Sequence, residues 1–192
     1  MKKLFALLLI IGCIFACASC GDDDATPTAL DAFKNAVAAS NPTGAVIDID
    51  VDTELGKLHS NYIVTYNQDG TVTIKYTEEE FAPFDPANPA APAKNTDEGT
   101  VVLAADGTYA GSISGTAAGI AAGISLDVAA LTDATVSDGG VLTATVAAAN
   151  TESVLGFNVG ADVFVKLSIF DGVVERLDMS YGTTKVSCVY QK

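Results

Sequence analysis

Aspartate and histidine side chains between positions 48 and 59 come nearest to the spacing of a metal site. Asp48, Asp50 and Asp52 alternate with apolar residues, and His59 is the only histidine. A calcium loop that began at Asp48 would need glycine at its sixth position and glutamate at its twelfth, where Thr53 and His59 stand. Alternate carboxylates on a strand lie about 6.6 Å apart, too far for neighbours to share one ion. We therefore predict a solvated acidic face, no metal site and no cofactor.

Catalytic equipment is not evident in the rest of the chain. A single imidazole has no second histidine for a relay, so we expect His59 to be a surface residue and not a general base. Glu78–Glu80 has the same interpretation as the aspartates. The sequence contains no nucleophile elbow, phosphate loop or zinc-protease motif. Its 24 acidic residues could supply a carboxylate pair, but there is no tryptophan to stack on a sugar. We expect no enzymatic activity and no catalytic residue.

Cysteine is the residue type whose placement does indicate chemistry. Lys2 and Lys3 are followed by the apolar run Leu4–Ile14 and then by a cysteine-containing stretch that ends at Cys20. A basic start, an apolar core and small residues at a cleavage point are typical of a secretory signal peptide. We therefore assign residues 1–19 to a signal peptide that is not part of the fold.

The end of this segment resembles the lipobox of bacterial lipoproteins, in which a small residue precedes a cysteine that becomes acylated. Cys20 follows Ala18-Ser19, allows the longest apolar core and is followed at once by a polar stretch. Cys17 is the alternative, whereas cleavage at Cys13 would leave too short a core. An uncleaved anchor is disfavoured because about 15 apolar residues are short for a span of about 20. The resemblance implies that Cys20 carries the lipid, palmitate or a similar fatty acid.

The residues after Cys20 give a location. Asp22–Asp24 resembles the acidic export signal that one Gram-negative phylum uses to place lipoproteins on the outer face of the outer membrane. This resemblance implies a protein anchored in the outer membrane and facing the cell exterior, with the periplasmic face as the alternative. Two or three acyl chains at about 0.8 kcal/mol per methylene would hold it durably. Residues 20–26 would then be a lipidated acidic tether.

Charge and length limit what the mature protein can do. Removal of 19 residues from 192 leaves 173, enough for one domain, which we place at residues 27–192. Without Lys2 and Lys3, eight basic residues stand against 24 acidic ones, a net charge of −16. Such a protein repels nucleic acid, so no nucleic-acid partner is expected. Only Cys188 remains beside Cys20, which leaves no internal disulfide and makes Cys188 a small core residue.

The elements that must carry these residues are one helix and then many strands. A helix is expected from Pro27 to Asn41, with Leu30, Phe33 and Val37 at helical spacing. Alternating residues predict strands around 47–52, 58–66 and 72–77. Residues 82–99 contain four prolines and are expected to form a Pro/Ala-rich loop. A hairpin of 100–104 and 108–114 follows, and three strands from Val163 to Tyr190 form a C-terminal meander.

Two small segments are expected to cover the sheet. Gly107–Leu126 lacks any charge and contains glycine at every fourth position from Gly115 to Gly123. It is predicted to be a flexible connection or a short helix that lies over the sheet. A second short helix is expected at Thr151–Leu155, closed by Gly156. As a cover above an apolar face, Gly115–Leu126 could gate a ligand cavity.

The complete pattern is mainly β, with a strongly curved antiparallel sheet or unclosed barrel of about 8–10 strands, an N-terminal helix and short covering helices. This order of elements resembles the LolA/LolB-like lipoprotein-carrier superfamily, which implies a concave apolar sheet face that can hold acyl chains. No family residue can be transferred, because the resemblance lies in pattern and not in a motif. The expected function is a non-catalytic lipoprotein that binds an apolar ligand or acyl chain.

The alternative is a structural or interaction subunit that presents an acidic sheet face to a protein partner at the cell surface. A cavity beneath Gly115–Leu126 would favour ligand binding. A core filled solidly by side chains such as Tyr62, Tyr76, Phe164 and Leu177 would favour the interaction role.

Overall fold

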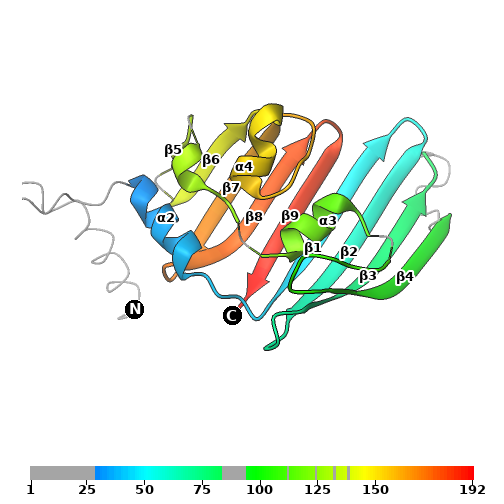
Figure 1. Cartoon of the computed structure of the whole chain (residues 1–192). Helices are drawn as coiled ribbons and strands as arrows, with labels where there is room; N and C mark the ends of the chain where they lie inside the picture. The colour runs from blue at the N-terminus through cyan, green and yellow to red at the C-terminus, as the bar shows by residue number, and fades with distance from the viewer. Residues whose placement is uncertain (1–28, 84–93, 112, 124, 132, 138) are drawn as a thin grey trace, which may run out of the picture.

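The sheet is the organising element of the molecule. The computed structural model describes residues 29–83, 94–111, 113–123, 125–131, 133–137 and 139–192. Within these ranges nine strands form one antiparallel sheet in the order β4-β3-β2-β1-β9-β8-β7-β6-β5, with the helices against one of its faces (Figure 1). β4 and β5 are its two edges, so the sheet is not closed. The expected mainly β class with an unclosed sheet is confirmed.

The strands follow the chain as two groups. The hairpin half consists of β1–β4 and the meander half of β5–β9, and β1 pairs with β9 where they meet. The bounds are β1 Gly44–Thr53, β2 Gly56–Tyr66, β3 Val72–Phe81, β4 Asn95–Leu103, β5 Thr135–Val136, β6 Val141–Val146, β7 Val163–Phe170, β8 Val173–Tyr181 and β9 Thr184–Gln191.

Alternation along each strand decides which side chains the helices cover. In β1, Ile47 and Ile49 are buried against the helix-covered face, while Asp48 and Asp50 lie on the uncovered face. The two-residue side-chain period of a strand produces this division. The register keeps it across the sheet, because Ile47 pairs with Tyr62 on one side and with Cys188 on the other. Cys188 is fully buried, as the sequence predicted.

Three α-helices and two short 3-10 turns are described. They are α2 (Ala29–Ala39), α3 (Gly115–Ala121) and α4 (Thr151–Leu155), with η1 (Val128–Ala130) and η2 (Ala148–Asn150). α2 packs against β8 and η1, and α3 packs against β1. In Figure 1, α2 and α4 lie in front of the meander half and α3 near the junction of the halves, while no described helix lies in front of β3 and β4.

Both expected covering segments are confirmed as short helices. α3 buries Ala117, Ile120 and Ala121 against the sheet. α4 ends at Gly156, whose φ of 81° is a left-handed conformation that glycine adopts without strain. The N-terminal helix is confirmed as well, with Phe33 and Ala36 buried.

Two boundaries predicted from the sequence are wrong. The Pro/Ala-rich loop expected over 82–99 ends earlier, because β4 begins at Asn95 and pairs with β3; residues 84–93 of that loop lie outside the described residues. Of the strand expected at 108–114, the described residues (108–111, 113 and 114) form one bridge, between Leu103 and Tyr109. Gly111 has a φ of 141° and leaves the extended conformation, so the chain turns away from β4 toward α3.

The buried residues form one continuous core. Its members run from Phe33 to Tyr190 and come from both halves of the sheet and from all three α-helices. A chain that begins at Gly21 therefore contains every described core residue.

β5 and β6 complete the meander half at its edge, and neither strand was predicted from the sequence.

Candidate functional site

A hollow of about 350 Å³ opens on the helix-covered face where β1–β3 of the hairpin half meet the ends of β8 and β9, beside the start of α3. Its floor follows the cross-strand register. Thr184, Val51 and Leu58 are successive neighbours on β9, β1 and β2, and Ile49 and Ser60 belong to the next row. The lining residues are Ile49, Val51, Leu58, Ser60, Tyr62, Glu78, Ile113, Ser114, Thr116, Tyr181 and Thr184. This volume is within the range of small-ligand sites.

The start of α3 forms the rim of this hollow. The Ser114 hydroxyl accepts a hydrogen bond from the Ala117 N–H at 3.0 Å and caps the helix. In the same turn, Thr116 Oγ1 and Tyr181 OH are hydrogen-bonded at 3.0 Å, which ties the helix to β8. The rim is therefore fixed to the sheet on the meander side.

Tyr62 and Glu78 form the polar wall. The Tyr62 hydroxyl donates to Glu78 Oε1 at 2.6 Å, and Tyr62 is almost completely buried. Burial, followed by the hydrogen bond to Glu78, raises the pKa of Tyr62 to about 12, although the Ser60 and Ser114 hydroxyls act in the opposite direction. Tyr62 is therefore a neutral donor at physiological pH and holds Glu78 toward the hollow.

The inner side of α3 itself is packed solidly. Ala117 and Ala121 have no exposed surface, and Ile120 is 2% exposed. A phenylalanine side chain occupies the space beside Gly119, where an added Cβ would meet the Phe157 ring. The described residues therefore leave no cavity beneath α3 where one was hypothesised, and the hollow lies instead beside its N-terminal end. Phe164, expected among core-filling side chains, instead lies on the uncovered face and is 47% exposed, because Val163 and Val165 take the inward positions of β7.

The candidate metal and base residues lie on the uncovered face, away from the hollow. Asp50 Oδ1 contacts Lys57 Nζ at 2.8 Å and His59 Nδ1 at 3.0 Å. Burial acts to raise the pKa of Asp50, but hydrogen bonds from Lys57 and His59 outweigh it and lower the pKa below its usual range. Asp48 accepts a hydrogen bond from Asn61 at 2.8 Å. These carboxylates are engaged by neighbouring side chains, and the described residues contain no cluster of three metal-ligating side chains.

The uncovered face is not uniformly acidic. A shallow hollow of about 360 Å³ there is lined by Asp48, Asp50 and Asp178 together with Lys166, Arg176 and Lys185. Arg176 Nε donates to Asp178 Oδ1 at 2.7 Å. Acidic and basic residues therefore alternate across neighbouring strands instead of forming the acidic face that the sequence suggested.

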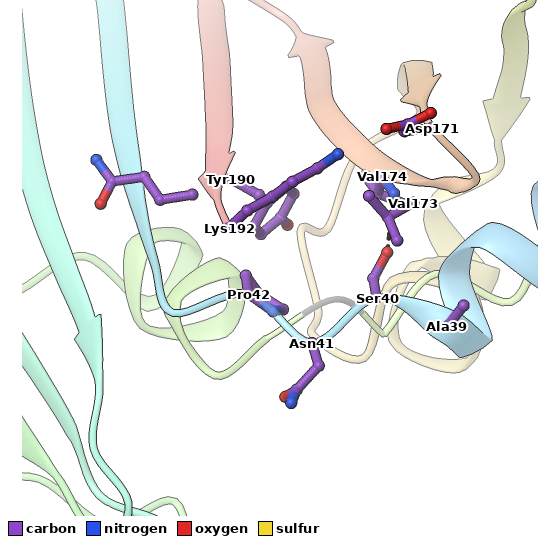
Figure 2. A pocket seen from close by; sticks show the side chains of 10 residues that line it. Ala39, Ser40, Asn41, Pro42, Asp171, Val173, Val174, Tyr190 and Lys192 are labelled. Atoms are coloured by element: carbon purple, nitrogen blue, oxygen red, sulfur yellow. Dashed lines mark hydrogen bonds between the residues drawn. The ribbon is translucent and has the colours of Figure 1, made fainter.

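A third hollow, of about 250 Å³, lies where the segment after α2 meets the ends of β8 and β9 (Figure 2). The Ser40 hydroxyl accepts from the Val174 N–H at 2.8 Å and donates to the Ala36 carbonyl at 2.7 Å. Lys192 Nζ lies 5.2 Å from the centre of the Phe170 ring. The Ser40 hydrogen bonds fasten the end of α2 to β8.

The remaining cysteine is inert. Burial raises the pKa of the Cys188 thiol to about 12. Cys20, Cys17 and Cys13 lie outside the described residues, so lipid attachment at Cys20 stays a prediction. Among the described residues, no helix is long and apolar enough to span a membrane.

Glu78 is a residue of the candidate site that the sequence interpretation missed. It was grouped with Glu79 and Glu80 as a solvated acidic face, yet its side chain shares a face with Ile74 and Tyr76. Continuing the two-residue period of β3 past Tyr76 places Glu78 on the covered face and Glu79 on the uncovered face. The sequence therefore contained the signal that distinguishes these two residues.

Comparisons with known proteins give little further information. No protein-family model and no curated protein matches the chain. Among solved structures, the chain is similar to the crystal structure of LprF from Mycobacterium bovis, with 14% sequence identity over 86% of this chain and 93% of that chain and a TM-score of 0.42. A similarity at this level identifies neither a family nor a function, so the function rests on the residues of this chain.

Proposed function

We propose that this protein is a non-catalytic, lipid-anchored binding protein that holds a small apolar ligand or one acyl chain in the hollow beside α3. The observation that carries the proposal is the composition of that hollow. Ile49, Val51, Leu58 and Ile113 supply apolar walls, while the Tyr62–Glu78 pair supplies a polar end. Apolar walls with a few convergent polar groups are the usual construction of a small-molecule site.

Exposure within the hollow supports the same proposal. Leu58 is 38% exposed although its neighbour Tyr62, on the same face of β2, is 1% exposed. Its cross-strand neighbours Val51 and Glu80 are also partly or fully exposed, so this end of the hollow is open. The exposed Leu58 side chain offers surface that an apolar ligand can cover, at about 25 cal/mol per Å² removed from water.

Native mass spectrometry of a chain that begins at Gly21 tests ligand binding. We expect one copy of a single-chain amphiphile bound per protein, either carried through purification or added by titration. Dodecanol is the neutral probe for the titration. Val51→Phe should fill the hollow and abolish this binding, because Val51 is a partly exposed lining residue. Val46→Phe is the matched control, since Val46 lies on the opposite face of the same strand. A clean apo mass with no uptake on titration would overturn the binding proposal.

The anchor is tested separately. We propose acylation at Cys20, an outer-membrane location and exposure to the cell exterior, supported by the lipobox-like segment and Asp22–Asp24. Metabolic labelling with an alkyne fatty acid should mark the full chain and fail for Cys20→Ser, while Cys17→Ser stays labelled. Protease treatment of intact cells should degrade the protein if it faces outward. If Cys17→Ser abolished the labelling instead, the attachment point would be Cys17.

The interaction role is a second candidate. The uncovered face presents Ile63, Phe164 and Val189 with 39–49% of their surfaces exposed. Cross-linking in membranes that captures one stoichiometric protein, together with no uptake of any amphiphile, would favour this role over ligand binding.

A further inference from the structure

The hollow beside α3 carries charge of one sign. Glu78 is the only charged residue among the described residues that line it. The register places Asp97 of β4 directly opposite Glu78, and Glu80 two residues along β3 on the same face. Asp97 and Glu80 therefore add negative charge near Glu78 and make the electrostatic potential at the polar end of the hollow more negative.

Lys94, the basic residue that contacts Glu80, is already paired. Lys94 Nζ lies 3.4 Å from Glu80 Oε1, and the Lys94 side chain is 63% exposed. Asn95 donates to the other oxygen of Glu80 at 2.6 Å. Lys94 is not among the lining residues of the hollow, so it supplies no cation to a bound ligand.

Glu78 has room for another donor. A carboxylate accepts several hydrogen bonds, and within the described residues Tyr62 is the partner that donates to Glu78. Tyr62 contacts Oε1, which leaves Oε2 to accept from a ligand. Donation from an ammonium to a carboxylate is a charge-assisted hydrogen bond and is stronger than donation from a neutral hydroxyl.

We infer that the hollow selects amphiphiles that carry an amine, with the alkyl chain along Val51, Leu58 and Ile113 and the ammonium on Glu78. A carboxylate of the same chain length is repelled by Glu78 and finds no cation in the lining. This inference rests on the proposed ligand-binding function and narrows its ligand class from apolar chains in general to amines.

Isothermal titration of the chain that begins at Gly21, at about 0.15 M salt, compares dodecylamine, dodecanol and dodecanoate below their critical micelle concentrations. We expect affinity to fall in that order, with dodecylamine at least about tenfold tighter than dodecanoate, since about 1.4 kcal/mol of charge interaction gives a factor of ten. Glu78→Gln should bring the three affinities to within about threefold. Glu79→Gln removes the same charge from the opposite face of β3 and should keep the wild-type order.

A second variant keeps the test decisive if the Glu78→Gln protein does not fold. Thr184→Lys places a cation in the lining at a partly exposed position and should strengthen dodecanoate binding and weaken dodecylamine binding, each by about tenfold. Equal binding of all three probes, or tightest binding of dodecanoate, would overturn the amine inference and leave the hollow as a general apolar site. Binding of none of the three would overturn the proposed function itself. An amine preference that Glu79→Gln abolishes would show non-specific attraction to an acidic protein and would also overturn the inference.

Discussion

The two halves belong to one antiparallel sheet, but they differ in how fully their helix-covered faces are buried. In the meander half, Val163, Val165 and Leu167 of β7 have no exposed surface, and α2 packs against the neighbouring strand β8 and against η1. In the hairpin half, the corresponding face carries Ser60, Tyr62 and Glu78 beside apolar residues, and α3 packs against β1. Solid apolar cover supplies stability, whereas a partly covered face with polar groups leaves room for a ligand.

This contrast shows how one core can serve two purposes. The buried residues of both halves belong to the same cluster, so the meander half can stabilise a hollow that the hairpin half alone would not support. A two-stranded hairpin is marginally stable on its own, and independent stability needs further strands with a hydrophobic face or packing against a helix. The comparison therefore predicts unequal responses to equivalent substitutions in the two halves.

The largest difference is expected for leucine truncation. Leu167→Ala should lower the free energy of unfolding by about 2–5 kcal/mol, because Leu167 is fully buried and its removal leaves a cavity. Leu58→Ala should cost less than about 1 kcal/mol, since Leu58 is 38% exposed at the hollow. Urea denaturation of the chain from Gly21 measures both. Equal losses would mean that the hollow is closed by packing and that the contrast between the halves is wrong.

Thiol labelling tests whether the halves stay joined. Cys188 of β9 lies next to Ile47 of β1, and burial raises its pKa to about 12. In the chain from Gly21, where it is the only cysteine, labelling by a thiol reagent at pH 8 should be slower than in urea by roughly two to three orders of magnitude. Rapid labelling without denaturant would indicate that β9 and β1 separate in the native state.

Removal of tyrosine hydroxyls should give opposite results at two sites. Tyr62→Phe removes a donor to Glu78 and should cost about 1–2 kcal/mol. The buried Tyr190 hydroxyl has only the weakly hydrogen-bonding Cys188 thiol beside it among the described residues, so Tyr190→Phe should be neutral or stabilising by up to about 1 kcal/mol. Thermal unfolding compares the pair. A loss at Tyr190 as large as at Tyr62 would place a hydrogen-bond acceptor, such as an internal water, beside Tyr190.

The smallest expected effect is on the pH dependence of stability and comes from Asp50 on the uncovered face. The folded-state pKa of Asp50 lies below its unfolded value of 3.8, so its contribution to stability is present above pH 3.8 and is lost as the pH falls through the folded-state pKa. Asp50→Asn should therefore flatten the fall in unfolding free energy below about pH 4. Parallel denaturation curves of the wild type and the variant between pH 5 and 2.5 would contradict this assignment.

Prediction from the sequence succeeded where the pattern was local. The period of two in Ile47–Val51 and in Val163–Ile169 gave strands with the correct inward faces, and Gly156 correctly ended a short helix. It failed where pairing decided the outcome. Residues 95–99 are polar and follow a proline-rich stretch, yet they form a strand because β3 offers them an open edge. Residues 108–114 alternate as a strand would, but find no such partner beyond one bridge.

By itself the sequence determined the mainly β class, the order of most elements, the burial of Cys188 and the residues of the proposed lipid anchor, because periodicity and a linear motif are properties of neighbouring residues. Only the tertiary structure decided where the hollow lies and which acidic residue enters it. Glu78 lies in the hollow because it pairs with Tyr62, 16 positions away, and because the start of α3, further along the chain, forms the rim. Such a site depends on long-range register and packing, and these are set by the whole sheet.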